Sequence, residues 1–129
     1  MKLLLIVTAV LEAGVGLALL AFPSVTVVLL LAAPLEASTA VTLGRVAGAA
    51  LLALGVANWL AQYDEQSYAA RGLVAAMVVY NLGAVAILGT AGILSQPVGI
   101  GLWPGVAVHA AMAVWCVLCL LKTPRMKTK

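Results

Sequence analysis

Four long apolar runs take up most of the chain, at residues 3–22, 39–61, 69–94 and 98–121. A helix needs about 20 apolar residues to cross the hydrocarbon core of a bilayer, and each run meets that length. The pattern predicts an all-α fold, an integral membrane four-helix bundle. The four spans leave no room for a separate soluble domain, so residues 1–129 are expected to form a single transmembrane domain.

The composition supports this prediction. The chain is 65% hydrophobic and 9% charged, with a mean hydropathy of +1.19. A chain of 129 residues cannot enclose that much apolar surface in a water-soluble core. The lipid bilayer is therefore its expected partner.

The first run resembles a signal peptide only superficially. Lys2 supplies a positive start, but Glu12 interrupts the hydrophobic stretch, and no small-residue cleavage site precedes Pro23. We expect this run to be retained as a helix.

The charges indicate an orientation. The net charge of +3 comes largely from a basic tail at residues 122–129, which is typical of a juxtamembrane segment and does not indicate nucleic-acid binding. The connections at residues 23–38 and 95–97 contain no Lys or Arg. With Lys2 at the other terminus, the positive-inside rule predicts a multi-pass protein with both termini in the cytoplasm.

The connection after the first run holds an apolar segment between Pro23 and Pro34 that is too short to cross a bilayer. Two arrangements fit it. The preferred one is a short re-entrant or interfacial helix over the outer mouth of the bundle. The other is an extension of the first helix, bent at Pro23.

Small residues predict where the helices approach closely, because lipid supplies no hydrophobic force between helices. One line on the second helix consists of Gly44, Gly48, Leu51, Gly55, Asn58 and Gln62. Further close-approach positions are expected at Gly14, Gly16, Gly83, Gly89, Gly101 and Gly105. Internal packing is the preferred explanation; the alternative is an interface in a homo-oligomer or a larger membrane complex.

Each predicted helix carries a polar residue at depth. Glu12 lies ten residues after Lys2, about 15 Å along a helix, where a carboxylate costs roughly 2.5–3.5 kcal/mol unless it is compensated. Arg45, Asn81 and His109 lie at comparable depths on the other three helices. An ion pair between Glu12 and Arg45 is the first partnership expected.

Two interpretations of this polar cluster remain open. In one, the residues form a satisfied network that fixes helix register and does no chemistry. In the other, they line a small cavity that binds a ligand or passes a proton. The ligand-binding or proton-linked candidates are Glu12, Arg45, Tyr80, Asn81 and His109.

A metal or haem site is a weaker candidate. His109, Met112, Cys116 and Cys119 fall on roughly one helix face and are ligand types used by copper(I) and haem. One helix cannot by itself enclose a metal, and the two cysteines are better explained as buried thiols. We therefore expect no metal, no cofactor, no catalytic residue and no enzymatic activity.

The layout resembles the DoxX-like families of small four-helix bacterial membrane proteins. The similar features are Gly16 and Pro23 around the end of the first helix, the outer apolar segment, and the sequence from Gly44 to Gly55 that opens the second helix. The resemblance covers most of the chain and implies the architecture. It also implies a bacterial inner-membrane location and an accessory or assembly role.

The chain is also similar to the small multidrug resistance transporters. Their essential carboxylate in the first helix corresponds to Glu12, followed here by Gly14 and Gly16. Arg45 and the apolar outer segment at residues 25–33 depart from that pattern.

Three functions follow from the sequence, in order of preference. The first is a non-enzymatic accessory, binding or scaffold component whose polar cluster holds a small ligand. The second is a proton-coupled small-molecule transporter that uses Glu12. The third is a membrane oxidoreductase or metal binder that uses His109, Cys116 and Cys119.

Overall fold

The structure is a computed structural model that describes residues 1–95 and 97–122, and those residues form helices and connecting turns with no strand. The elements are α1 (Lys2–Ala21), α2 (Pro23–Leu31), α3 (Ser38–Ala61), the short helix η1 (Gln62–Asp64), α4 (Tyr68–Leu94) and α5 (Leu102–Lys122). In the described part of the chain, four helices are each long and apolar enough to cross a membrane. They are α1, α3 extended by η1, α4, and α5. The prediction of an all-α four-helix membrane bundle is therefore confirmed.

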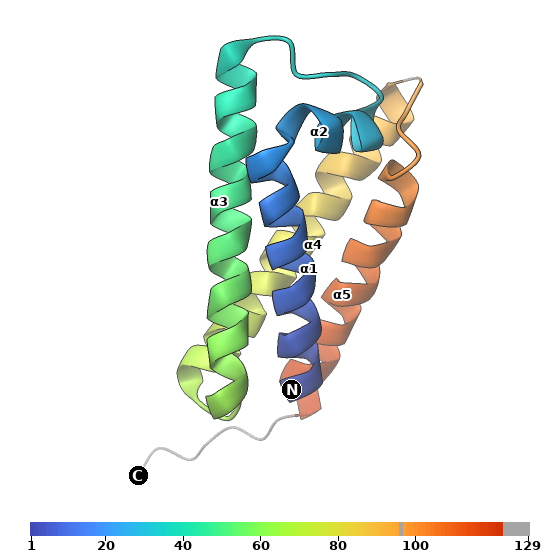
Figure 1. Ribbon diagram of the computed structural model, residues 1–129. Helices are drawn as coiled ribbons and strands as arrows, with labels where there is room; N and C mark the ends of the chain where they lie inside the picture. Colours follow the sequence, from blue (N-terminus) through green and yellow to red (C-terminus); the bar gives the residue numbers. More distant parts are fainter. Residues whose placement is uncertain (96, 123–129) are drawn as a thin grey trace.

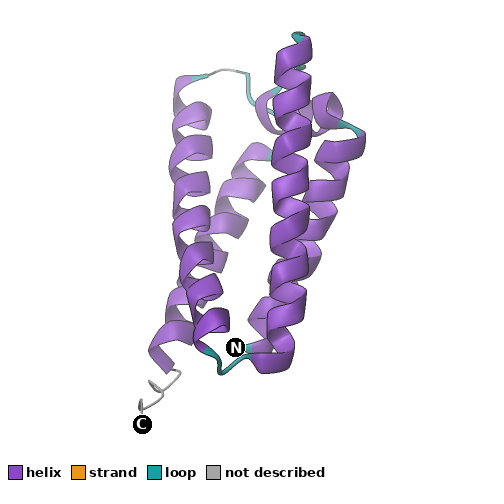
Figure 2. Ribbon diagram, turned by 90° about the vertical axis from the view of Figure 1, so that its left-hand side faces the viewer, coloured by secondary structure: helices purple, strands orange, loops and turns teal. Residues whose placement is uncertain are grey.

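The four long helices form two closely packed pairs. α1 packs along α3, and α4 packs along α5, while the contact between the pairs is less extensive. Figure 1 shows α2 at one end of the bundle, and the start of α1 and the η1 turn at the other. The turned view in Figure 2 shows the same arrangement.

Glycines allow α1 and α3 to approach at the level of their backbones. A Cβ atom added at Gly48 would lie 2.8 Å from the carbonyl oxygen of Gly16, and one added at Gly55 would lie 2.9 Å from the amide nitrogen of Ala13. Gly48, Gly55 and Asn58 are buried along this line. The predicted small-residue line therefore packs inside the chain, against α1.

Other predicted close-approach sites are wrong within this chain. At Gly14, Gly83 or Gly89, an added Cβ atom would meet no heavy atom of the described residues within 4 Å. These glycines therefore face open space on their helices, and their missing Cβ atoms bring no backbones together.

The connection after α1 contains a separate short helix, as preferred from the sequence. Phe22 leaves the helical conformation, with φ −134° and ψ 59°, and Pro23 occupies the first position of α2, where its missing N–H group costs nothing. α2 ends at Ala32, which adopts a left-handed conformation with φ 56° and donates its N–H to the carbonyl of Val28. α2 is therefore a distinct element and not a bent continuation of α1.

The turn before α5 binds the C-terminal end of α2. The amide of Gly99 donates to the carbonyl of Leu30 at 3.0 Å, and the amide of Gly101 donates to the carbonyl of Leu29 at 2.8 Å. These bonds satisfy carbonyl groups that the end of a helix leaves without partners. They also explain why α5 begins at Leu102 and not at residue 98 as predicted.

The core lies toward the end that carries the start of α1. Its buried side chains are Leu4, Leu5, Val74, Met77, Met112 and Cys116, from α1, α4 and α5. At the same end, the amino nitrogen of Met1 lies 3.2 Å from Oε2 of Glu65. This core fills the space between the helix pairs over part of their length only.

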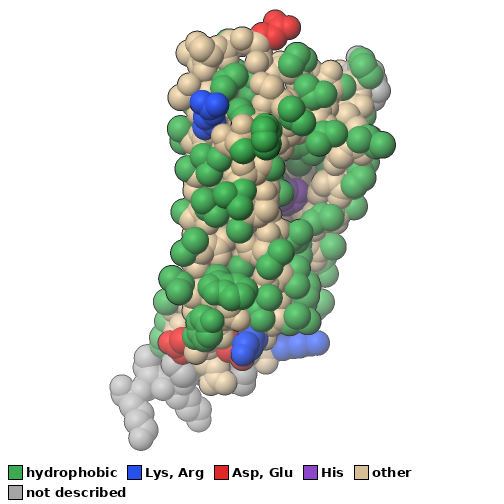
Figure 3. All heavy atoms as spheres, in the orientation of Figure 1, with side chains coloured by type: hydrophobic (Ala, Val, Ile, Leu, Met, Phe, Trp, Pro, Cys, Tyr) green, Lys and Arg blue, Asp and Glu red, His purple; other side chains and the backbone are tan. Residues whose placement is uncertain are grey.

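The face shown in Figure 3 carries charged side chains mainly near its two ends, with a broad band of hydrophobic side chains between them. Large apolar side chains such as Leu43, Val79 and Ile87 are exposed along their helices. The exposure of this much apolar surface is compatible with a lipid environment, because contact between apolar side chains and lipid carries no hydrophobic penalty.

Candidate functional site: a cavity beneath α2

A cavity of about 400 Å³ lies between α1, α2, α4 and α5. Most of its wall is aliphatic, and its polar lining residues are Thr8, Glu12, Thr26, Tyr80, Asn81 and His109. Met112 belongs both to the cavity wall and to the buried core, so the core closes the cavity toward the end with the chain start. α2 covers the opposite end. The volume falls within the range of small-molecule sites, about 300–1,000 Å³.

Glu12 opens into this cavity and makes no hydrogen bond or ion pair with the described part of the chain. Its side chain is only 7% exposed. Its oxygens are nonetheless not sealed by protein atoms, since the residue forms part of the cavity wall. A carboxyl group in this position requires a proton or a hydrogen-bond donor in the cavity.

The predicted ion pair between Glu12 and Arg45 is wrong. Arg45 is exposed, and α3, the helix that carries it, contributes no residue to the cavity wall. The reason is the rotation of α3 about its own axis, which sets the direction of each side chain, because successive helix residues point about 100° apart. Gly44 and Gly48 turn toward α2 and α1, which directs Arg45 away from the interior.

His109 and Asn81 form the polar contact between α5 and α4. The His109 Nδ1 atom lies 2.8 Å from Asn81 Oδ1, and the amide group of Asn81 donates to the carbonyl of Met77 at 2.7 Å. Because the amide nitrogen is used in that second bond, the oxygen faces the imidazole and must accept. The ring therefore donates through Nδ1, and its Nε2 atom is the acceptor when the ring is neutral.

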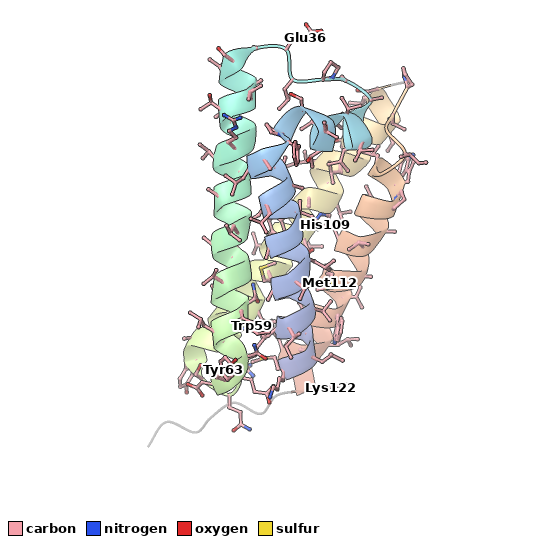
Figure 4. The ribbon with its side chains drawn as sticks, viewed as in Figure 1. Glu36, Trp59, Tyr63, His109, Met112 and Lys122 are labelled. Carbon is pink, nitrogen blue, oxygen red and sulfur yellow. The ribbon has the colours of Figure 1, made fainter. Side chains whose placement is uncertain are left out.

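Tyr80 packs against the same imidazole. The two ring centroids lie 5.5 Å apart with an interplanar angle of 78°, an edge-to-face contact. Figure 4 shows His109 and Met112 on α5, directed toward the interior of the bundle. Tyr80, Asn81 and His109 are thus held relative to one another, and with Glu12 they surround one volume.

Four of the five sequence candidates therefore meet at the cavity, and Arg45 does not. Thr8 and the α2 residues were missed. Thr8 is 2% exposed and lies one turn before Glu12 on the cavity side of α1. The spacing of four residues between Thr8 and Glu12 places both side chains on one helix face and could have identified Thr8. Nothing in the local sequence indicates that α2 lies above the cavity.

The metal-ligand candidates are divided between two environments. His109 and Met112 line the cavity, whereas Cys116 lies in the core and Cys119 packs against it. Among the described residues, no group of three or more His, Cys, Asp or Glu side chains is arranged to hold a metal ion.

Comparison of the chain with protein-family models, with curated proteins and with solved structures found no match in any of the three.

The polar groups in the cavity are mainly hydrogen-bond acceptors. The carboxyl group of Glu12 accepts when ionised, and the neutral ring of His109 accepts through Nε2. The Tyr80 hydroxyl can both donate and accept. Aliphatic side chains form the rest of the wall. The site therefore suits a molecule with an apolar body and one or two donor groups.

Proposed function

We propose that this chain is a non-enzymatic membrane binding component that holds a small apolar molecule, with a hydrogen-bond-donating head group, in the cavity beneath α2. The observation that carries the proposal is Glu12, a carboxyl group more than nine-tenths buried that faces the cavity and makes no hydrogen bond or ion pair with another described residue. A structural network would be expected to satisfy this group internally. A binding site leaves it for the ligand.

The proposal includes a location and an orientation. The basic residues near the chain ends and the lysine- and arginine-free connections on the other side support a bacterial cytoplasmic membrane with both termini inside. The resemblance to DoxX-like proteins supports an accessory role within a larger membrane assembly. In this orientation α2 lies on the outer side.

Binding can be tested with three probes of similar size: 2-phenylethylamine, 2-phenylethanol and propylbenzene. The chain contains a single histidine, so histidine labelled with ¹³C and ¹⁵N gives one imidazole signal from inside the cavity. We expect saturable shifts of that signal in nanodiscs, with the amine and the alcohol binding more tightly than the hydrocarbon. Equal affinity for all three probes would remove the role assigned to Glu12.

Two variants sharpen this test. Glu12→Gln should remove the advantage of the amine, because the neutral amide cannot pair with an ammonium group. Arg45→Gln is the matched control, since Arg45 is a polar residue on a membrane helix that does not line the cavity. A loss of amine binding in both variants would indicate a general effect of charge and not a site.

A proton-coupled transporter is the second candidate, and one observation favours it. Glu12 has no cationic partner among the described residues, so its carboxyl group is available to exchange protons with a substrate. Such a transporter would have to open the core around Leu5 and Met77 to release substrate on the other side. Uptake of an amine probe into vesicles, driven by a pH gradient and abolished by Glu12→Gln, would support transport over binding alone.

A further inference from the structure

The cavity wall is incomplete along one line. Leu11 and Val15 of α1, Leu29 of α2 and Val108 of α5 contribute to the wall, yet they are 40%, 45%, 52% and 46% exposed. Side chains that both line a cavity and reach the outer surface mark its opening. Three of them come from α1 and α5, which face each other across the space between the packed pairs and make only slight direct contact. Leu29 belongs to α2, which covers one end of that space.

The other directions are closed. Toward the start of α1, the cavity ends at Met112, which also belongs to the buried core. Toward the opposite end it is covered by α2, whose C-terminal carbonyls are bound by the amides of Gly99 and Gly101. The buried face of α4, with Asn81 at 2% exposure, closes the back.

The opening faces the apolar band of the molecule. Figure 3 shows the purple imidazole of the single histidine at the back of a recess, surrounded by hydrophobic side chains and away from the charged ends. An opening at this level faces hydrocarbon when the protein lies in a bilayer.

We infer that the ligand enters the cavity sideways from the bilayer, through the gap between α1 and α5, and is therefore a lipid-soluble molecule and not a solute taken from water. This inference rests on the proposed binding function and adds the source and class of the ligand. A molecule that leaves lipid for an aliphatic cavity gains little from hydrophobic burial, because the two environments are alike. Selection then depends on the head group and its contacts with Glu12, Tyr80 and His109.

The route can be tested by the accessibility of Glu12 to carbodiimides. A protonated carboxyl group adds to a carbodiimide to give an O-acylisourea, which rearranges to a stable N-acylurea; no group leaves and no oxidant is needed. Dicyclohexylcarbodiimide dissolves in lipid, whereas a carbodiimide with a quaternary ammonium group stays in water. Mass spectrometry of peptides locates the adduct.

In vesicles, we expect the lipid-soluble reagent to label Glu12 at least tenfold faster than the water-soluble one. The exposed Glu36 in the turn between α2 and α3 serves as the internal control and should react with the water-soluble reagent. Labelling of Glu12 by both reagents at similar rates would overturn the lateral route and indicate an aqueous entrance.

Substitutions at the opening provide a second arm. Val15→Trp and Val108→Trp place a large side chain in the gap and should slow labelling of Glu12 by the lipid-soluble reagent at least tenfold. Leu17→Trp is the matched control, because Leu17 is 55% exposed on α1 but does not line the cavity. Equal slowing in all three variants, or in none, would contradict the route.

A measurement on the unmodified chain avoids any folding effect of these substitutions. A lipid with a nitroxide in its acyl chain should broaden the imidazole signal of His109, and a water-soluble gadolinium chelate should not. Broadening by the chelate alone would reject lateral entry. If the route holds but the phenylethyl probes do not bind, the proposed binding function fails and the lateral opening stands.

Discussion

The Nδ1 atom of His109 lies 2.8 Å from Oδ1 of Asn81, a direct polar contact between α5 and α4 within the wall of the cavity. The second bond of Asn81, to the carbonyl of Met77, determines which way the amide points. This pair therefore sets the tautomer of the imidazole as well as its orientation.

The first prediction concerns that tautomer. In ¹⁵N spectra of labelled histidine, the neutral ring should carry its proton on Nδ1, because Asn81 Oδ1 can only accept. Asn81→Ala removes the acceptor and should lower stability by about 1 kcal/mol, with the ring becoming a mixture of tautomers. A neutral ring protonated on Nε2 in the unmodified chain would show that the contact is reversed.

The second prediction concerns the glycine contact between α1 and α3. Gly48→Ala should reduce the free energy of unfolding in mixed detergent micelles by about 1–3 kcal/mol, because the new Cβ atom would lie 2.8 Å from the carbonyl oxygen of Gly16 and 2.9 Å from the amide nitrogen of Leu20. These are backbone atoms, so the helices themselves must separate.

Gly14→Ala is the control for that experiment. An added Cβ atom there has open space, and alanine favours a helix over glycine by about 0.8–1.0 kcal/mol, so stability should be unchanged or higher. Equal destabilisation by both variants would contradict the assignment of Gly48 to the packing interface.

The third prediction concerns the cover of the cavity. Gly99→Ala should weaken the attachment of α2, because a Cβ atom at this position would collide with the carbonyl group of Leu29. We expect faster hydrogen exchange at the amides of Gly101 and of α2, and a shifted His109 signal. Gly89→Ala on α4, where the added atom meets nothing, should leave both unchanged.

The fourth prediction tests the absence of an ion pair. In a double-mutant cycle of Glu12→Gln and Arg45→Gln, the coupling energy should be below about 0.5 kcal/mol, the level expected for sites without a shared contact. Unfolding free energies of the four proteins provide the measurement. A coupling well above that level would restore the pair that the sequence suggested.

The sequence predicted the parts of this protein that depend on local composition. Hydrophobic length placed the four spans to within a few residues, and the two prolines correctly indicated a separate segment before α3. The same approach misplaced the start of α5, because the residues before it are apolar but bind the end of α2 instead of beginning a helix. Only contact with a segment about 70 residues earlier determines that boundary.

The candidate site shows the same division. Depth along each helix follows from counting residues at a fixed rise, and it correctly grouped Glu12, Asn81 and His109. Rotation about each helix axis does not follow from depth, because a helix with apolar residues on all sides can turn any face inward without a hydrophobic penalty in lipid. This is why Arg45 was assigned to the interior and Thr8 was overlooked.

The sequence alone therefore determined that the chain dissolves in a bilayer as four helices with a few polar residues at mid-depth. The tertiary structure decided which of those residues meet. Backbone contact at Gly16, Gly48 and Gly55 sets the rotation of α3 and directs Arg45 outward. Glu12 then remains without an ionic partner among the described residues, at a cavity that α2 covers, because close packing of small residues, and not charge attraction, controls how these helices meet.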